Sequence, residues 1–185
     1  VYLHLIQKTL AEGRGAIVMV PEIALTPGLL QIFISHFGRQ VAVLHSCLPT
    51  GERYDEWKRV RDGKASVVIG TRSAVFAPLE KLGLVILDEE QEGSYQSESM
   101  VRYHAREVAK FRCTQHKGLL LLGSATPAVE SRYAAETGRY HLFTMTARYN
   151  AHDLPQVRLA DMKEELRRGN HTGPVSYTHL RAHET

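Results

Sequence analysis

Short apolar runs alternate along this chain with segments whose apolar residues recur every three or four positions. The runs are rich in valine, isoleucine and leucine, as in strands buried on both faces, and they lie at residues 16–20, 41–44, 66–69, 84–87 and 119–122. The periodic segments predict helices at residues 1–12, 27–37, 50–62, 102–111 and 127–133. Their regular alternation predicts an α/β fold, an open parallel sheet with helices on both faces.

Two helices have recognisable starts. Thr26 followed by Pro27 predicts an N-cap and a proline at the first helical position. Thr50 is predicted to cap the next helix in the same way. A helix N-terminus presents free amide groups, so the start at Thr26 is a candidate phosphate site, with ordinary capping as the alternative.

The strand at residues 84–87 runs directly into acids, in the sequence LVILDEEQ. Ligands of open parallel sheets bind beyond the carboxyl ends of the strands, where Asp88 is the first polar residue. We predict that Asp88 holds Mg²⁺ through water and that Glu89 orients or deprotonates an attacking water. Glu90 and Gln91 complete the predicted nucleotide-binding set with Asp88. The alternative is a solvated turn or the acidic first turn of a helix.

Two further segments carry groups that suit a nucleic acid. Residues 70–74, GTRSA, follow a strand and offer amides, hydroxyls and one fixed charge to a phosphodiester, although Arg72 could instead pair with a local acid. Tyr95 and Tyr103 flank the polar, irregular stretch at 93–101, with Arg102 and Arg106 nearby. Such residues can stack on bases and hold the backbone, and packing is the alternative.

A compact turn, GSATP at residues 123–127, follows the last strand. If this strand lies beside the one that ends at Asp88, the hydroxyls of Ser124 and Thr126 can bond the acids and report their state. An ordinary strand-to-helix turn is the alternative.

Composition limits the remaining choices. With 185 residues and 43% hydrophobic content the chain can bury one core. The formal charge of +3 and a pI near 8.9 permit a nucleic-acid partner without proving one. Cys47 and Cys113 form no CxxC pair, so two reduced thiols are expected rather than a disulfide or zinc site. No apolar run reaches the length of a membrane span, and we expect a cytoplasmic protein.

Four segments, taken in order and spacing, resemble the motifs of superfamily 2 helicases, and more closely those of bacterial primosomal replication-restart helicases. They are PEIALTP at 21–27, IGTRSA at 69–74, DEEQ at 88–91 and GSATP at 123–127. The resemblance covers about residues 1–161. It implies a RecA-like motor lobe that uses ATP and Mg²⁺ to unwind DNA 3′ to 5′ at stalled forks. The implied partners are forked DNA, other primosome proteins and single-stranded-DNA-binding protein.

The same resemblance implies roles for individual residues. Asp88 binds magnesium and Glu89 activates water, while Ser124 and Thr126 couple hydrolysis to movement. Residues implied in DNA binding come from three segments and are Thr26, Arg72, Ser73, Tyr95, Arg102 and Tyr103.

The chain also departs from that family pattern. The family's glycine-rich phosphate loop precedes the residue that matches Val1, so we expect this chain to lack that loop and the first strand. We expect a gap or an exposed apolar edge in the sheet, and a marginal domain. The second lobe, the zinc-binding insert and an N-terminal DNA-binding domain are expected elsewhere in the intact protein. Gln91 replaces a histidine of the family's acidic motif. The family places an aromatic-rich segment after that motif, where this chain has residues 93–106, and Val101 replaces a tryptophan there.

We therefore expect three segments: lobe one at residues 1–146, the start of a linker at 147–172, and a non-native tail at 173–185. A short strand at 157–159 and a charged helix at 162–168 are predicted within the linker. In the tail, His179 and His183 share a helical spacing, but two histidines without a third ligand do not make a metal site.

Two functions of different classes remain. The chain is either an inactive piece of a helicase motor or a binding module that holds DNA without turnover. A magnesium nuclease built on Asp88, Glu89 and Glu90 is disfavoured because no lysine lies in register with the acids.

Overall fold

The computed structural model describes residues 1–98 and 101–146, together with positions 161, 163, 167, 171–172 and 175–176. The chain divides into a unit at Val1–Leu142 and a second at Phe143–Thr185. In the second unit β6 (His171–Thr172) pairs antiparallel with β7 (Val175–Ser176), and positions 163 and 167 of the predicted charged helix are helical. The strand predicted at 157–159, His179 and His183 lie outside the described residues, and the three predicted segment boundaries stay predictions.

The first unit is built on a five-stranded parallel sheet in the order β2-β3-β1-β4-β5. The strands are β1 (Gly15–Met19), β2 (Val41–Leu44), β3 (Val67–Gly70), β4 (Leu82–Leu87) and β5 (Leu119–Leu122). Every residue of β1, β3 and β4 is buried, as their unbroken apolar runs require. The predicted open parallel α/β sheet is confirmed.

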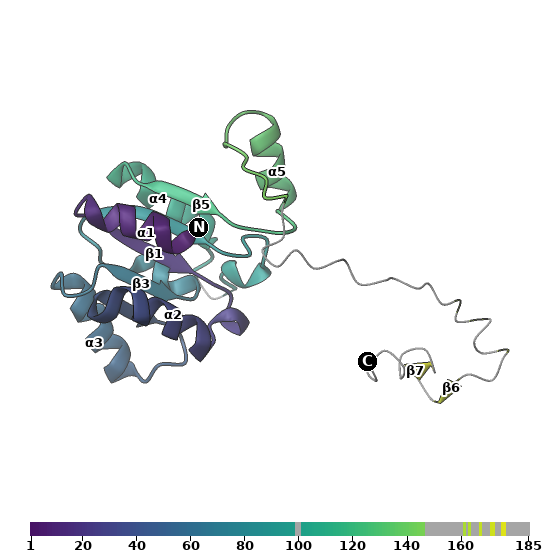
Figure 1. Ribbon diagram of the computed structural model, residues 1–185, viewed down its shortest axis with the longest axis horizontal. Helices are drawn as coiled ribbons and strands as arrows, with labels where there is room; N and C mark the ends of the chain where they lie inside the picture. The colour runs from purple at the N-terminus through teal and green to yellow at the C-terminus, as the bar shows by residue number, and fades with distance from the viewer. Residues whose placement is uncertain are drawn as a thin grey trace. The chain divides into compact units, whose positions relative to one another are not determined.

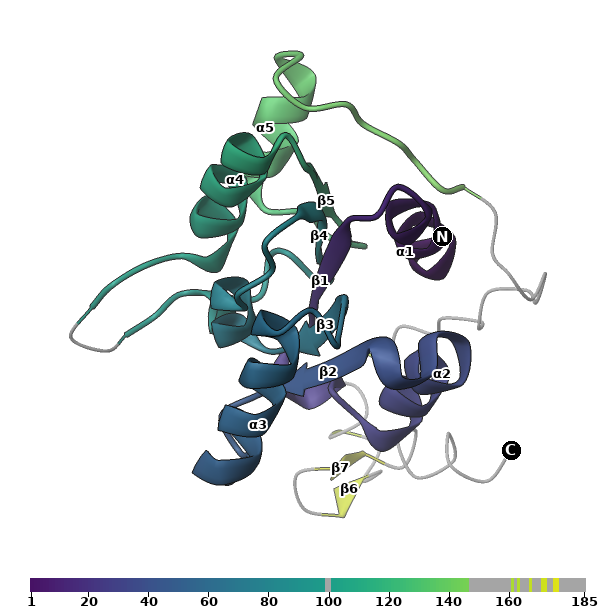
Figure 2. The ribbon, with the colours of Figure 1, turned by 90° about the vertical axis from the view of Figure 1, so that its left-hand side faces the viewer.

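Helices cover both faces of this sheet (Figures 1 and 2). On one face lie α1 (Tyr2–Ala11) and α2 (Pro27–Phe37), and on the other α3 (Thr50–Arg61) and α4 (Ala105–His116). Ile6 and Phe33 anchor the first pair in one core cluster, and Val60 and Ala109 anchor the second pair in the other. A shorter helix, α5 (Val129–Glu136), follows β5. Among the described residues, no helix has the length and apolar character needed to cross a membrane.

The sequence pattern predicted one of the two helix starts correctly and missed the short 3₁₀ turns. Thr26 caps α2 as predicted, accepting a hydrogen bond from Leu29 N at 3.3 Å, with Pro27 first in the helix. The prediction for Thr50 was wrong: Pro49 is the N-cap of α3 and Thr50 is already helical. In the part of the chain that the structure describes, four 3₁₀ turns escaped the pattern: η1 (Glu22–Ala24), η2 (Gly38–Gln40), η3 (Arg72–Phe76) and η4 (Gly93–Tyr95). They are only three to five residues long, too short to show a period.

The sheet is continuous among the described strands, and its edge strand β5 is exposed. Neighbouring strands are hydrogen-bonded throughout, so the gap considered from the sequence does not occur among the described strands. The alternative expectation, an exposed apolar edge, fits β5, whose four leucines are exposed or half-buried. Leu119 exposes 55% of its surface.

Candidate functional site

The acidic stretch begins where β4 ends, at the carboxyl edge of the sheet. The backbone amide of Asp88 donates to Met19 O of β1 at 2.9 Å, which fixes the first acid beside the central strand. Its Oδ1 accepts a 2.6 Å hydrogen bond from the hydroxyl of Tyr2, in the first turn of α1. Burial of Tyr2, and then this bond, raise the pKa of the phenol well above its ordinary value, so the hydroxyl remains a donor.

Tyr2 was not among the residues predicted from the sequence. In the sequence it is one position of an amphipathic helix, and only the tertiary fold brings it to an acid 86 positions away.

Glu89 has a positive φ of 47°, a conformation that costs a non-glycine residue about 1–2 kcal/mol. The half-buried carboxylate accepts a 2.8 Å hydrogen bond from Gln91 Nε2. Backbone that is strained at the end of a buried strand is common at functional sites, and here it belongs to the predicted catalytic acid.

The turn after β5 does lie beside these acids, as predicted, because β5 pairs with β4 and Leu122 is in register with Leu87. Ser124 Oγ donates to Gln91 Oε1 at 2.5 Å, and Gln91 in turn donates to Glu89. Thr126 takes part through its backbone amide, which donates to Ser124 Oγ at 2.9 Å. A continuous hydrogen-bonded route therefore joins Glu89 to the following turn. We call Glu89, Gln91 and Ser124 the acid relay.

Glu90 has different surroundings. Its side chain is buried, and Oε2 lies 2.9 Å from both Arg106 Nη1 of α4 and Ser131 Oγ of α5. Its other oxygen accepts from Ala128 N at 2.7 Å. Both carboxylate oxygens are thus engaged by the protein, so the geometry does not fit the nucleotide contact that the sequence suggested for Glu90.

Tyr95 is also buried, at 1% exposure, and its hydroxyl lies 2.7 Å from Asp88 O and 3.0 Å from Met19 O. Burial, followed by the nearby charge of Asp88, raises its pKa above the ordinary value. A ring held in this way has no face open to a base. The packing alternative describes Tyr95 better than the stacking prediction does.

Arg72 lies at the start of η3 and binds the segment that follows the acids. Its Nη1 donates to Gln96 O at 2.6 Å and to Ser94 O at 3.2 Å. Its guanidinium carbon lies 6.0 Å from the centroid of the Tyr103 ring. The described partners of Arg72 are therefore carbonyls and a ring rather than the local acid considered above.

The aromatic stretch closes on itself at its base. Ser97 N donates to Tyr103 O at 2.7 Å, and Gln96 forms an isolated antiparallel bridge with His104. His104 caps α4, because its Nδ1 accepts from Arg106 N at 3.1 Å. Burial and then the charge of Arg106 lower the pKa of His104, which favours the neutral acceptor. We call residues 96–104, of which 99 and 100 are not described, the aromatic loop.

The other predicted DNA contacts lie on the surface. Ser73 and Arg102 are exposed, and Thr26 is exposed at the N-terminus of α2. The structure therefore keeps these three side chains accessible.

The acids are chemically suited to magnesium. Asp88 and Glu89 are half-buried carboxylates at one sheet edge, and hard cations prefer such oxygen ligands. In the part of the chain that is described, no three His, Cys, Asp or Glu side chains gather as a closed metal site. Asp88 and Glu89 alone would therefore hold a magnesium ion through one or two carboxylates, with water and phosphate as its other ligands.

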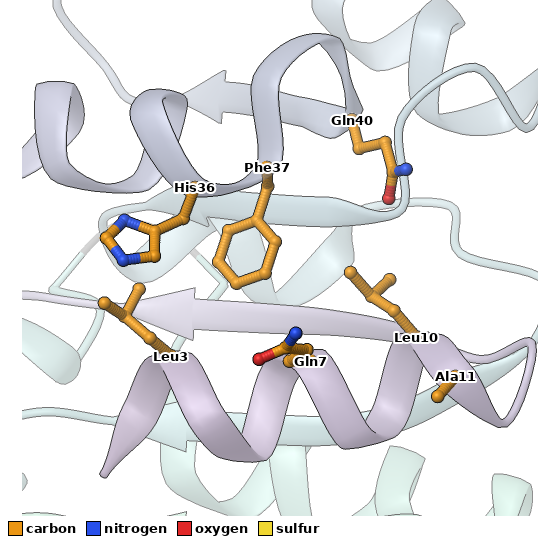
Figure 3. Close-up of a pocket in the computed structure, with 7 residues that line it drawn as sticks. All are labelled: Leu3, Gln7, Leu10, Ala11, His36, Phe37 and Gln40. Carbon is orange, nitrogen blue, oxygen red and sulfur yellow. The ribbon is translucent and has the colours of Figure 1, made fainter.

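A separate hollow of about 370 Å³ lies between α1 and α2 (Figure 3). Leu3, Leu10 and Phe37 are among its lining residues, and none of the acids described above contributes to it. Its lining carries no acid and no lysine or arginine, so we assign it no part in the chemistry.

A match to the DEAD/DEAH box helicase family covers residues 1–134. The chain belongs to the DEAD/DEAH box helicase family. The chain is 52% identical over 170 residues to the replication restart protein PriA of Bacillus subtilis strain 168, covering 92% of this chain and 21% of that protein. It is 46% identical over 165 residues to PriA of Treponema pallidum strain Nichols, covering 89% of this chain and 25% of that protein.

The curated relatives therefore confirm the resemblance to replication-restart helicases, at 35–52% identity. The chain spans between a fifth and a quarter of the length of these two relatives. Among solved structures, the C-terminal domain of the DEAD-box protein Dbp5 is 19% identical with a TM-score of 0.46, covering 73% of this chain and 78% of that chain.

Proposed function

We propose that this chain is the ATP-binding lobe of a replication-restart helicase that couples ATP hydrolysis to 3′–5′ unwinding of DNA. The observation that carries the proposal is the acid relay, a hydrogen-bonded route from Glu89 through Gln91 to Ser124. A motor must link the state of its hydrolytic acid to a movable segment, and this relay supplies such a link between two strand ends.

This geometry supports the following proposed roles. Asp88, held by Tyr2, binds Mg²⁺ through water, and the ion supplies positive charge for the β- and γ-phosphates. Glu89 orients and deprotonates the attacking water. Gln91 contacts the nucleotide and passes its state to Ser124 and, through the turn, to Thr126.

DNA contact is proposed for the exposed polar groups at strand and helix ends. Thr26, Ser73 and Arg102 hold the phosphodiester backbone, and Arg72 and Tyr103 support the loop that senses DNA. In the intact protein we propose forked DNA, primosome proteins and single-stranded-DNA-binding protein as partners, in the bacterial cytoplasm. Residues 147–172 are proposed to lead toward a second lobe.

The second candidate applies to the 185-residue chain on its own, as a DNA-binding module without turnover. Residues 1–185 contain no glycine-rich loop ending in Gly-Lys-Ser or Gly-Lys-Thr. Without its amides and lysine, the β- and γ-phosphates lose most of their cradle, so Asp88 and Glu89 have little to act on.

The test is ATPase activity with forked DNA, measured on this chain and on a version extended at both ends to the length of its curated relatives. We expect turnover only in the extended protein, and a loss of about 10²–10⁴-fold with Glu89→Gln. Glu130→Gln, the same change at an exposed position of α5, is the control and should retain activity. ATP hydrolysis by the short chain, or an extended Glu89→Gln protein of normal activity, contradicts this account.

A further inference from the structure

An exposed aromatic side chain stands beside the aromatic loop and has no role in the account above. Phe76, the last residue of η3, exposes 54% of its surface. Its ring centroid lies 5.1 Å from that of Tyr103, at an interplanar angle of 73°. Phe76 therefore makes a T-shaped contact with a second aromatic ring while about half of its surface faces solvent.

Tyr103 is the better supported but less accessible of the two rings. It is half-buried, it carries the Arg72 guanidinium over its ring, and it makes the edge contact with Phe76. The same arginine is tied to Ser94 O and Gln96 O. Tyr103 and Arg72 thus act as a support, and the aromatic surface left open belongs to Phe76.

The charge around this ring favours a polyanion. The Arg72 guanidinium lies over the neighbouring Tyr103 ring, and Arg102, next to Tyr103, is exposed. Glu98 of the aromatic loop is exposed too and contributes one opposing charge. An open aromatic face close to arginines is the combination with which proteins hold single-stranded nucleic acids, because the bases stack and the phosphates are neutralised.

We propose that Phe76 stacks on a base of single-stranded DNA, supported by Tyr103 and Arg72, while Arg102 holds the adjoining phosphates. This rests on the proposed DNA-binding function and adds a contact from η3, outside the aromatic loop. Since every base has a π-face, the contact is independent of sequence.

The experiment measures the affinity of the 185-residue chain for fluorescent oligothymidylate by anisotropy, with wild type, Phe76→Ala and Phe76→Trp. We expect Phe76→Ala to weaken binding about fivefold or more, the equivalent of losing one stacked base, and Phe76→Trp to retain it. An abasic deoxyribose-phosphate strand of the same length separates stacking from charge. On that strand, wild type and Phe76→Ala should bind equally.

The control is Phe111→Ala, which removes another ring, 64% exposed, from α4 and should leave the affinity unchanged. If Phe76→Ala binds oligothymidylate as wild type does, or weakens binding to both strands by the same factor, the stacking inference is overturned while DNA binding stands. If wild type binds neither strand, the proposed DNA binding of this chain fails as well. If Phe111→Ala matches Phe76→Ala, the effect is not local and the inference is overturned.

Discussion

Two tyrosines hold the first acid, one through its side chain and the other through its backbone. The Tyr2 hydroxyl donates to the carboxylate of Asp88, and the Tyr95 hydroxyl lies 2.7 Å from its carbonyl. A carboxylate that positions a hydrated ion must keep one orientation, and these contacts restrict both its backbone and its side chain. Tyr2 is therefore a positioning residue for the proposed magnesium ligand.

Removing the Tyr2 hydroxyl should weaken the fold in a pH-dependent way. The pKa of Tyr2 is raised above 10.0, so its contribution to stability is complete below about pH 10 and is lost as the pH rises through its folded value. We expect Tyr2→Phe to lower the free energy of unfolding by about 1 kcal/mol at pH 7, because a half-buried bond to a carboxylate is lost. Above pH 10 the difference from wild type should shrink, as measured by urea unfolding at several pH values.

The matched control is Tyr54→Phe, because Tyr54 is 57% exposed and stacks on Trp57 through its ring. It should leave stability within about 0.5 kcal/mol of wild type. A Tyr2→Phe protein as stable as wild type at pH 7 would show that the bond to Asp88 has no net value.

At this scale the sequence was informative where residue type and strand end coincide. Asp88, Glu89 and Ser124 could be placed at one edge because the carboxyl ends of parallel strands meet there. Glu90 and Tyr95 could not be separated from their neighbours, since only tertiary packing buries them. Glu89 and Glu90 are neighbours in the sequence, yet the carboxylate of Glu89 lies at the carboxyl edge of the sheet and that of Glu90 is buried against the helices.

A buried polar cluster around Glu90 joins the acidic stretch to two helices. Glu90, in the turn that follows β4, binds Arg106 of α4 and Ser131 of α5, and Arg106 Nη1 also lies 2.9 Å from Ser131 Oγ. Exposure of the side chains in the ion pair is 1% for Glu90 and 13% for Arg106. The cluster sets the position of both helices against the strand that carries the acid relay.

Arg106→Ala should be strongly destabilising, since it leaves the carboxylate of Glu90 buried without its cation. We expect a loss of about 3 kcal/mol in the free energy of unfolding, measured by urea denaturation at pH 7. Arg132→Ala removes an arginine from the exposed pair with Glu136 and should cost about 0.5 kcal/mol. Equal effects for the two variants would mean that burial adds nothing to the inner pair.

The elements themselves were largely predictable. The five strands are short unbroken apolar runs, and the helices between them show a clear period. The start of α3 was misplaced by one residue because Thr50 and Pro49 are both acceptable at a helix start. β3 approaches β2 so closely that a Cβ on Gly70 would lie 1.9 Å from Leu44 O. This close approach was not predicted from the sequence. That glycine is required by neighbouring backbone, a constraint with no periodic signal.

At the scale of the whole molecule, the outer edge of β5 is the surface expected to govern association. A strand edge offers unpaired backbone groups, and here it also exposes leucine side chains. We expect the 185-residue chain to associate with increasing concentration, as measured by sedimentation velocity. Leu119→Lys should reduce this association, because a charge on an edge strand opposes pairing with another edge.

Ile23→Lys provides the comparison, since Ile23 is 92% exposed but lies in η1 rather than on the sheet edge. It adds the same charge and should leave association unchanged. A wild-type chain that stays monomeric and unfolds cooperatively would contradict both the edge argument and the expectation of a marginal domain.

The left-handed backbone at Glu89 has a consequence for laboratory evolution. At a φ of 47° glycine is the least strained residue, so Glu89→Gly relieves the backbone while deleting the carboxylate proposed to activate water. A library selected for thermal stability alone would therefore enrich variants that have a less strained backbone but lack the carboxylate proposed to activate water. Selection for folding stability would favour glycine at position 89, whereas selection for turnover would favour glutamate.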